Sequence, residues 1–121
     1  MDLSGICMDL TGIWKVIVTG PWWFKAFNWL RDKKVIKGNA GHNVSYGKKW
    51  GKFEVIIDWE RSLFFLKYKN GRIKDKVWFV SENKLLGKFF WKTKFIGNFE
   101  MIRRDVDNGK RTIDNIKLYG L

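Results

Sequence analysis

Asp75 is the residue whose surroundings most clearly suggest chemistry, because the pattern around it turns its carboxylate inward. In RIKDKVWFV, residues 72–80, alternation places one set of side chains on a single face of a strand: Ile73, Asp75, Val77 and Phe79. A carboxylate among apolar side chains is costly unless it is hydrogen-bonded, paired or protonated. Asp75 could therefore anchor a ligand or act as a general base, or it could belong to a buried polar pair that only fixes strand register.

Two other side chains share the inward phase and could act with Asp75. Arg103 alternates in step with Phe99 and Met101, so we expect it to be the ion-pair partner of Asp75. Tyr68 is a candidate for a hydrogen bond to a ligand, although such a tyrosine can also be core with its hydroxyl at the rim.

Known catalytic and metal-binding patterns are missing from the sequence. It has no Ser-His-Asp order, Walker loop, dinucleotide glycine fingerprint or zinc spacing. The single histidine, His42, lies in GNAGHNVSYG, which predicts a flexible surface loop, and one imidazole without cysteines or clustered carboxylates cannot build a zinc site. The sequence therefore offers no positive support for an enzyme, a metal or a cofactor.

Alternation with a period of two predicts the strands that would position these residues. FEVIIDWE, residues 53–60, places Phe53, Val55, Ile57 and Trp59 inward. The inward set continues along later runs with Phe64, Leu66, Tyr68, Phe79, Leu85, Phe89, Trp91, Phe99 and Met101. Asn70-Gly71 between two runs is a strong hairpin signal. Asn108-Gly109 suggests one more hairpin into the tail, for which a terminal helix is the alternative.

Short connections between many consecutive strands favour an antiparallel meander, and about eight strands would protect their edges by closing into a barrel. We therefore predict an all-β fold, an antiparallel up-and-down β-barrel with one short helix after the first strand. No linker interrupts the chain, so residues 1–121 are expected to form a single domain. Glycine precedes an aromatic residue by two positions at Gly12, Gly51, Gly87 and Gly97, where a ring could cover the bare backbone of a bend.

The stretch GPWWFKAFNWL, residues 20–30, is predicted to be the short helix. Proline suits a first helical position, and Trp23, Phe27 and Leu30 follow at i, i+4 and i+7. A strand phase also fits these rings and is the alternative. As a helix, the stretch would cap one barrel end, with Trp22, Trp23 and Phe27 as a lid.

The charge balance is strongly basic. The 121 residues include 24 Lys and Arg against 12 Asp and Glu, a formal net charge of +12, which should attract anions or simply keep an aromatic protein dissolved. Cys7 is the sole cysteine, which excludes an internal disulfide and fits a reducing compartment. The N-terminus does not read as a signal peptide, and no run of about 18 apolar residues occurs. We expect a soluble cytoplasmic protein.

Many of the cations take the outward phase on three consecutive predicted strands. We call this set the basic panel: Lys67, Lys69, Arg72, Lys74, Lys76, Lys88 and Lys92. Phe65, Trp78 and Phe90 share its phase. Rings among cations suit single-stranded nucleic acid, but the same surface would serve as a homodimer interface, a dock for an anionic membrane, or a solvated face.

The first strand and a late arginine together resemble the lipocalin and calycin superfamily of small barrels. The residues that carry this resemblance are Gly12-Ile13-Trp14 and Arg103. The resemblance implies that Arg103 packs over the Trp14 ring at the closed end, a contact worth roughly 0.5 to 2 kcal/mol. It also implies that a small apolar ligand binds inside the barrel, and the shorter intracellular members are the better comparison.

These observations predict non-catalytic binding of a small hydrophobic ligand, either neutral or anionic, in the barrel mouth. The residues expected at this site are Trp22, Trp23, Phe27, Trp59, Tyr68, Asp75, Phe79, Trp91 and Arg103. The competing hypothesis is a nucleic-acid or partner-binding module that works through the basic panel around a solid interior. Volume should decide between them, because eight short strands enclose little more than their own side chains.

Overall fold

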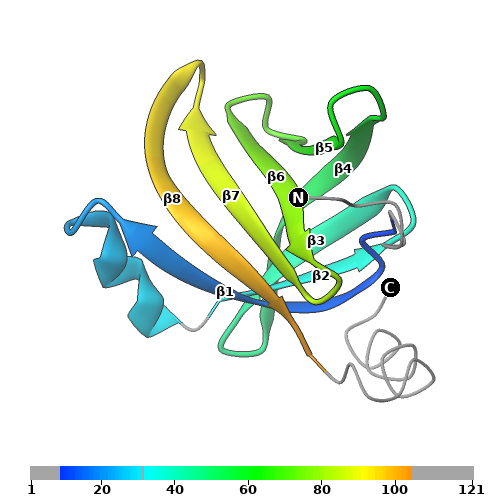
Figure 1. Cartoon of the computed structure of the whole chain (residues 1–121). Helices are drawn as coiled ribbons and strands as arrows, with labels where there is room; N and C mark the ends of the chain where they lie inside the picture. The colour runs from blue at the N-terminus through cyan, green and yellow to red at the C-terminus, as the bar shows by residue number, and fades with distance from the viewer. Residues whose placement is uncertain (1–8, 31, 105–121) are drawn as a thin grey trace.

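Eight antiparallel strands close into a barrel in the computed structural model, which describes residues 9–30 and 32–104 (Figure 1). The strands are β1 (Gly12–Gly20), β2 (Lys33–Lys37), β3 (Ala40–Ser45), β4 (Lys48–Asp58), β5 (Leu63–Tyr68), β6 (Ile73–Ser81), β7 (Lys84–Trp91) and β8 (Lys94–Arg103). Each strand pairs with the next, and β8 pairs with β1. The predicted all-β, up-and-down barrel is therefore confirmed. The Asn108-Gly109 turn and the alternatives for the tail lie outside the described residues.

Alternation sorts the side chains of most strands as expected. In β6, Asp75, Val77 and Phe79 are buried while the residues between them are half-buried or exposed. Ile57 and Trp59 are exceptions, because they were expected to face inward but are 36% and 68% exposed. Strand β4 ends at Asp58, and residues 59–62 form the turn into β5, so the period of two no longer applies at Trp59.

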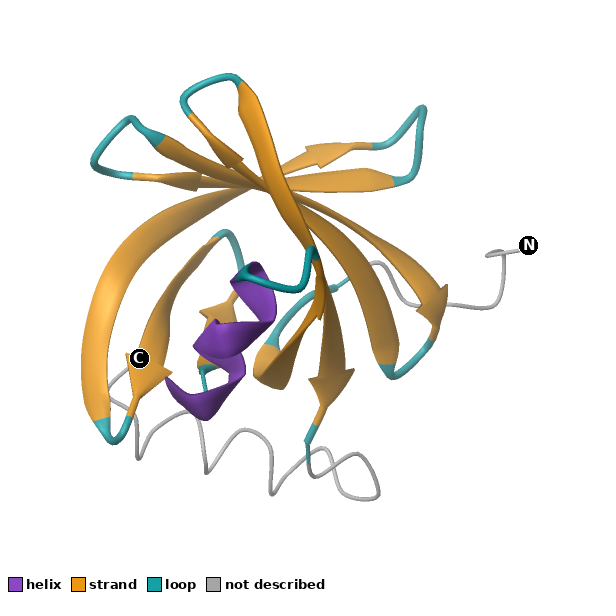
Figure 2. Ribbon diagram, turned by 90° about the vertical axis from the view of Figure 1, so that its left-hand side faces the viewer, coloured by secondary structure: helices purple, strands orange, loops and turns teal. Residues whose placement is uncertain are grey.

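The predicted helix after the first strand is present as a 3-10 helix, η1 (Phe24–Leu30). Figure 2 shows it lying across the opening at one end of the barrel. The Asn28 side chain fixes it to β1, since Val18 N donates to Asn28 Oδ1 at 2.6 Å and Asn28 Nδ2 donates to Val18 O at 2.8 Å. The β1–β2 ladder covers only Gly12 to Lys15, so Asn28 supplies the partner that strand β2 does not give to Val18.

Trp14 and Arg103 close the other end, as the resemblance implied. The two residues face each other across β1 and β8, and the Arg103 guanidinium carbon lies 4.2 Å from the centre of the Trp14 ring. Arg103 Nη1 also donates to Thr11 O at 2.7 Å, and the buried Trp14 Nε1 donates to Leu10 O at 2.8 Å. Arg103 is therefore committed to the closed end, which contradicts its predicted pairing with Asp75.

Glycines in the sheet leave room for rings from other elements. Gly87 of β7 stands opposite Phe99 of β8, and the Phe99 ring occupies the space that a Cβ at position 87 would need. Phe53 of β4 lies over Gly41 of β3 in the same manner. At Gly87 the covering ring thus comes from the neighbouring strand rather than from Phe89, and at Gly97 it comes from Phe24 of helix η1.

Gly87→Ala is expected to lower the free energy of unfolding by about 1 to 3 kcal/mol, because the buried Phe99 ring must leave its rotamer to admit a methyl group. Urea denaturation measures the loss. Phe99→Leu should suppress it, so that the double variant loses less than the two single losses added together. Strict additivity would show that the ring does not oppose a Cβ at position 87.

Candidate functional site

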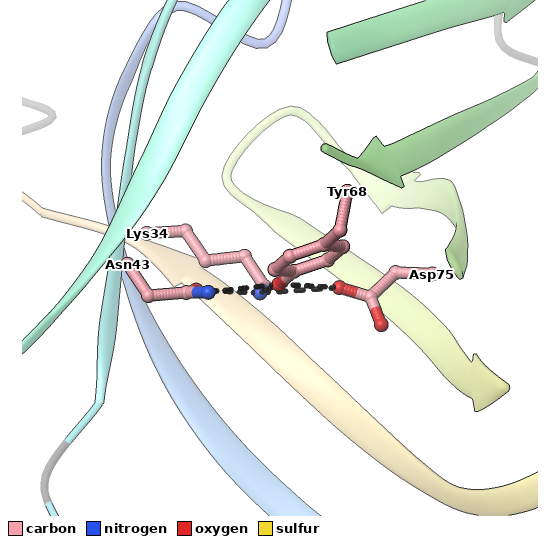
Figure 3. A network of polar contacts seen from close by, with 4 residues as sticks. All are labelled: Lys34, Asn43, Tyr68 and Asp75. Atoms are coloured by element: carbon pink, nitrogen blue, oxygen red, sulfur yellow. Dashed lines mark hydrogen bonds and ion pairs between the residues drawn. The ribbon is translucent and has the colours of Figure 1, made fainter. Parts of the chain in front are cut away.

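A polar quartet lies inside the barrel and consists of Lys34, Asn43, Tyr68 and Asp75 (Figure 3). Lys34 of β2 and Asn43 of β3 are register partners, and Tyr68 of β5 and Asp75 of β6 reach toward them from the facing wall. All four side chains take the inward phase of their strands and are buried. The quartet therefore joins two walls of the barrel through hydrogen bonds.

Each polar atom at the centre of the quartet has several partners. Lys34 Nζ donates to Asn43 Oδ1 at 2.7 Å and to Tyr68 Oη at 2.6 Å, and it lies 3.1 Å from Asp75 Oδ2. Asn43 Nδ2 donates to Tyr68 Oη at 2.9 Å, and Tyr68 Oη donates to Asp75 Oδ2 at 3.1 Å. This arrangement satisfies a buried ammonium with three oxygen acceptors.

The contacts and the burial of the quartet shift the acid strengths of its members. Burial alone would lower the pKa of Lys34, but Asp75 and Tyr68 outweigh it and the pKa rises above its ordinary value. Burial raises the pKa of Asp75, against the opposing effects of Lys34 and Tyr68. Burial, followed by the Asp75 charge, raises the pKa of Tyr68 to about 12. Lys34 therefore stays protonated and is no nucleophile.

Lys34 takes the role that the sequence analysis assigned to Arg103. The prediction that Asp75 is buried and paired is confirmed, but the pairing with Arg103 is wrong. Both faces of β2 are covered, since Val35 and Ile36 are as buried as Lys34, so alternation could not tell which face is inside. Asn43 was also missed. Its segment NVSY, residues 43–46, is only a weak strand candidate within GNAGHNVSYG, a stretch expected to be a loop, whereas Asn43 lies in strand β3.

An apolar cavity of about 440 Å³ extends from the quartet to helix η1. Its lining includes five of the residues expected at the site: Trp23, Phe27, Tyr68, Asp75 and Trp91. Residues that were not expected also line it: Val16, Val18, Phe24, Asp32, Lys34, Asn43, Trp50, Phe89, Ile96 and Phe99. Phe24 of helix η1 is buried at this cavity and packs on Phe89, with 5.5 Å between the ring centres. The cavity volume falls within the range of about 300 to 1,000 Å³ typical of small-molecule sites.

Four expected site residues lie away from this cavity. Trp22 is 84% exposed and does not line the cavity, and Trp59 stands in the β4–β5 turn. Phe79 is buried against Trp14 at the closed end, with 6.2 Å between ring centres. Arg103 lies at the same end. The two ends of the barrel share one inward phase, so alternation could not show which end holds the opening.

The basic panel lies on the outer face of β5 to β7 and their connecting turns. Its members are exposed except for the half-buried Lys76. Register places Lys67 opposite Lys74 and Lys76 opposite Lys88. The rings among them are half-buried, and Lys74 Nζ lies 5.2 Å from the centre of the Phe65 ring. Like charges directly opposite each other destabilise a sheet, so this face retains an unfavourable electrostatic arrangement.

His42 differs most from its prediction, since it lies in β3 and is only 1% exposed. Its neighbour Asn43 faces the cavity, so His42 points to the outer face, opposite Val35. Val35 belongs there to a second apolar cluster with Ile13 and Val44. Burial lowers the pKa of His42 to about 4, and the charges of Lys49 and Lys52 act in the same direction.

Lowering the pH is expected to destabilise the folded protein through His42. The pKa of His42 is lower in the folded chain than its ordinary 6.5, so its contribution to stability is complete above pH 6.5 and is lost as the pH falls toward 4. Thermal melts of the wild type should therefore show a steeper loss between pH 6.5 and 4 than melts of His42→Gln. Parallel curves in that window would contradict a buried neutral imidazole.

In the part of the chain that the structure describes, no three His, Cys, Asp or Glu side chains gather to hold a metal ion, and no helix is long and apolar enough to cross a membrane. No family model, curated protein or solved structure matches the chain. Its closed barrel of eight antiparallel strands is compatible with a lipocalin-like fold.

Proposed function

We propose that this protein is a lipocalin-like binding protein that holds a small hydrophobic ligand inside its barrel without transforming it. The observation that carries the proposal is the cavity of about 440 Å³ between helix η1 and the polar quartet. The side chains of an eight-stranded barrel are enough to fill its interior at the density usual for proteins. An unfilled space of this size therefore supports a binding site. The barrel and the Trp14–Arg103 pair support the lipocalin-like assignment.

The lining supports an apolar ligand that carries little polar chemistry. Aromatic and aliphatic side chains make up most of the wall, and the quartet supplies polar atoms at one place only. Binding would remove apolar ligand surface from water, which contributes about 25 cal/mol for each Å² buried. Because Lys34 stays protonated and is paired with Asp75, the quartet is suited to holding a ligand rather than to transferring protons.

Filling the cavity is expected to abolish binding. Val18 of β1 lines the cavity, whereas the next residue toward the N-terminus, Ile17, faces outward opposite Glu100. Val18→Trp should weaken the binding of decanol at least tenfold in calorimetric titrations, and Ile17→Trp should leave it unchanged. If decanol does not bind the wild type, or binds both variants equally, the cavity is not its site.

The like-charge register of the basic panel favours a second candidate, binding of single-stranded nucleic acid. Opposed lysines would be relieved by phosphates lying between them, and the rings could stack with bases at about 1 to 3 kcal/mol each. Affinity for an oligonucleotide should then fall steeply with salt and be lost in Lys74→Glu/Lys88→Glu, but not in Lys37→Glu/Lys52→Glu on other strands. A flat salt response excludes this candidate, and self-association of the wild type would instead favour a homodimer through the panel.

A further inference from the structure

The hydrogen-bond donors of Lys34 and Tyr68 are used within the quartet. Lys34 has three N–H bonds, and its Nζ contacts three acceptors, which belong to Asn43, Tyr68 and Asp75. Tyr68 has one O–H bond, which points to Asp75 Oδ2. Near the mouth, the Trp50 indole nitrogen donates to Ser45 Oγ at 2.8 Å. Asn43 Nδ2 donates one of its two N–H bonds to Tyr68 Oη. A ligand that arrives with an acceptor, such as a carboxylate, would therefore have to break one of the Lys34 or Tyr68 bonds or depend on the second Asn43 N–H alone.

Asp75 provides the quartet with a hydrogen-bond acceptor that no residue of the quartet uses. Asp75 Oδ2 receives both Lys34 and Tyr68, while Asp75 Oδ1 is buried and has no hydrogen-bond partner among the described residues. Asp75 is 1% exposed and lines the cavity. A buried carboxylate oxygen without a hydrogen-bond donor destabilises the protein. A ligand that donates a hydrogen bond to this oxygen would therefore gain more binding free energy than it would at an exposed carboxylate.

The charges that line the cavity also disfavour an anionic ligand. Although the whole chain has a formal net charge of +12, the cavity is lined by one lysine, Lys34, and by two aspartates, Asp32 and Asp75. Lys34 is paired with Asp75, and Asp32 accepts a hydrogen bond from Ser45. The local field in the cavity therefore does not follow the charge of the whole protein.

We propose that the cavity selects apolar ligands whose head group donates a hydrogen bond, a hydroxyl or an amine, and that Asp75 Oδ1 is its acceptor. The inference rests on the proposed function and restricts it, because it excludes the anionic ligands that the basic composition suggests. The apolar body of the ligand would lie among the rings of Phe24, Phe89 and Trp91, with the donor directed at the quartet.

The test compares ligands that share one chain and differ in the head group. Decanol, decylamine, decyl methyl ether and decanoate compete, below their micellar concentrations, with the fluorescent probe aminoanthracene. We expect decanol or decylamine to bind at least tenfold more tightly than the ether and decanoate, a difference of about 1.4 kcal/mol. The comparison of decanol with decylamine shows whether the preferred donor is neutral or charged.

A double variant keeps the test specific. Lys34→Met/Asp75→Leu replaces the buried pair by apolar side chains and should reduce the preference for decanol over the ether to less than threefold, with binding of the ether retained. The matched control is Lys84→Met/Glu100→Leu, which removes an ion pair of 3.2 Å from the outer face and should keep the preference. Equal or tighter binding of decanoate by the wild type overturns the donor inference but leaves the proposed function standing. Failure of all four ligands to bind overturns both.

Discussion

Asp75→Leu is expected to lower the free energy of unfolding by about 3 to 5 kcal/mol, since it leaves the Lys34 ammonium buried without its counter-charge. Lys34 would keep its contacts with Asn43 and Tyr68, but neither is an anion at neutral pH. Urea denaturation followed by tryptophan fluorescence gives the loss, with an unchanged slope indicating an intact two-state transition.

The double variant Lys34→Met/Asp75→Leu distinguishes the stabilisation that the ion pair provides from the destabilisation caused by an unpaired buried charge. Replacing both members by apolar residues should restore stability to within about 1 kcal/mol of the wild type or exceed it. The control is Glu100→Gln, which breaks the half-buried pair with Lys84 at nearly the same distance and should cost no more than about 1 kcal/mol. A double variant as unstable as Asp75→Leu would mean that the quartet stabilises the barrel by more than charge compensation.

Trp14→Ala should also cost about 3 to 5 kcal/mol, because it empties a fully buried site that contacts Phe79 and lies beneath Arg103. Arg103→Met keeps much of the side-chain stem and removes the guanidinium, so its loss should be smaller, about 0.5 to 2 kcal/mol. Thermal and urea unfolding both report these differences. Because the site lies at the closed end, binding of decanol per folded molecule should stay the same in both variants, and a selective loss of binding would contradict the separation of the two ends.

Much of the fold could be predicted because its strands alternate cleanly. Asp75, Val77 and Phe79 lie where a period of two places them, and the Asn70-Gly71 turn joins β5 to β6. The phase failed where a strand ended, as at Trp59, and where both faces of a strand were covered, as at Lys34. Alternation describes only whether a residue is inside, so it cannot state how far along the barrel axis the residue lies.

Only part of the candidate site could be predicted, because alternation does not give the position of a residue along the barrel axis. Tyr68 and Trp91 line the cavity as expected, because their inward phase coincides with the open end of the barrel. Phe79 has the same phase but lies beside Trp14 at the other end. Lys34 was overlooked because lysines are seldom fully buried, so the composition of the chain favoured an outward position for it.

The pairing of β8 with β1 has a consequence for how the chain reaches its native state. The two strands come from opposite ends of the described sequence, so their pairing closes a longer loop than any hairpin of the barrel does and has a larger entropic cost, which grows only slowly with loop length. Until they pair, both strands expose unpaired backbone groups that could join those of another molecule. Pairing between residues so far apart in sequence raises the contact order, which correlates with slower folding across small proteins.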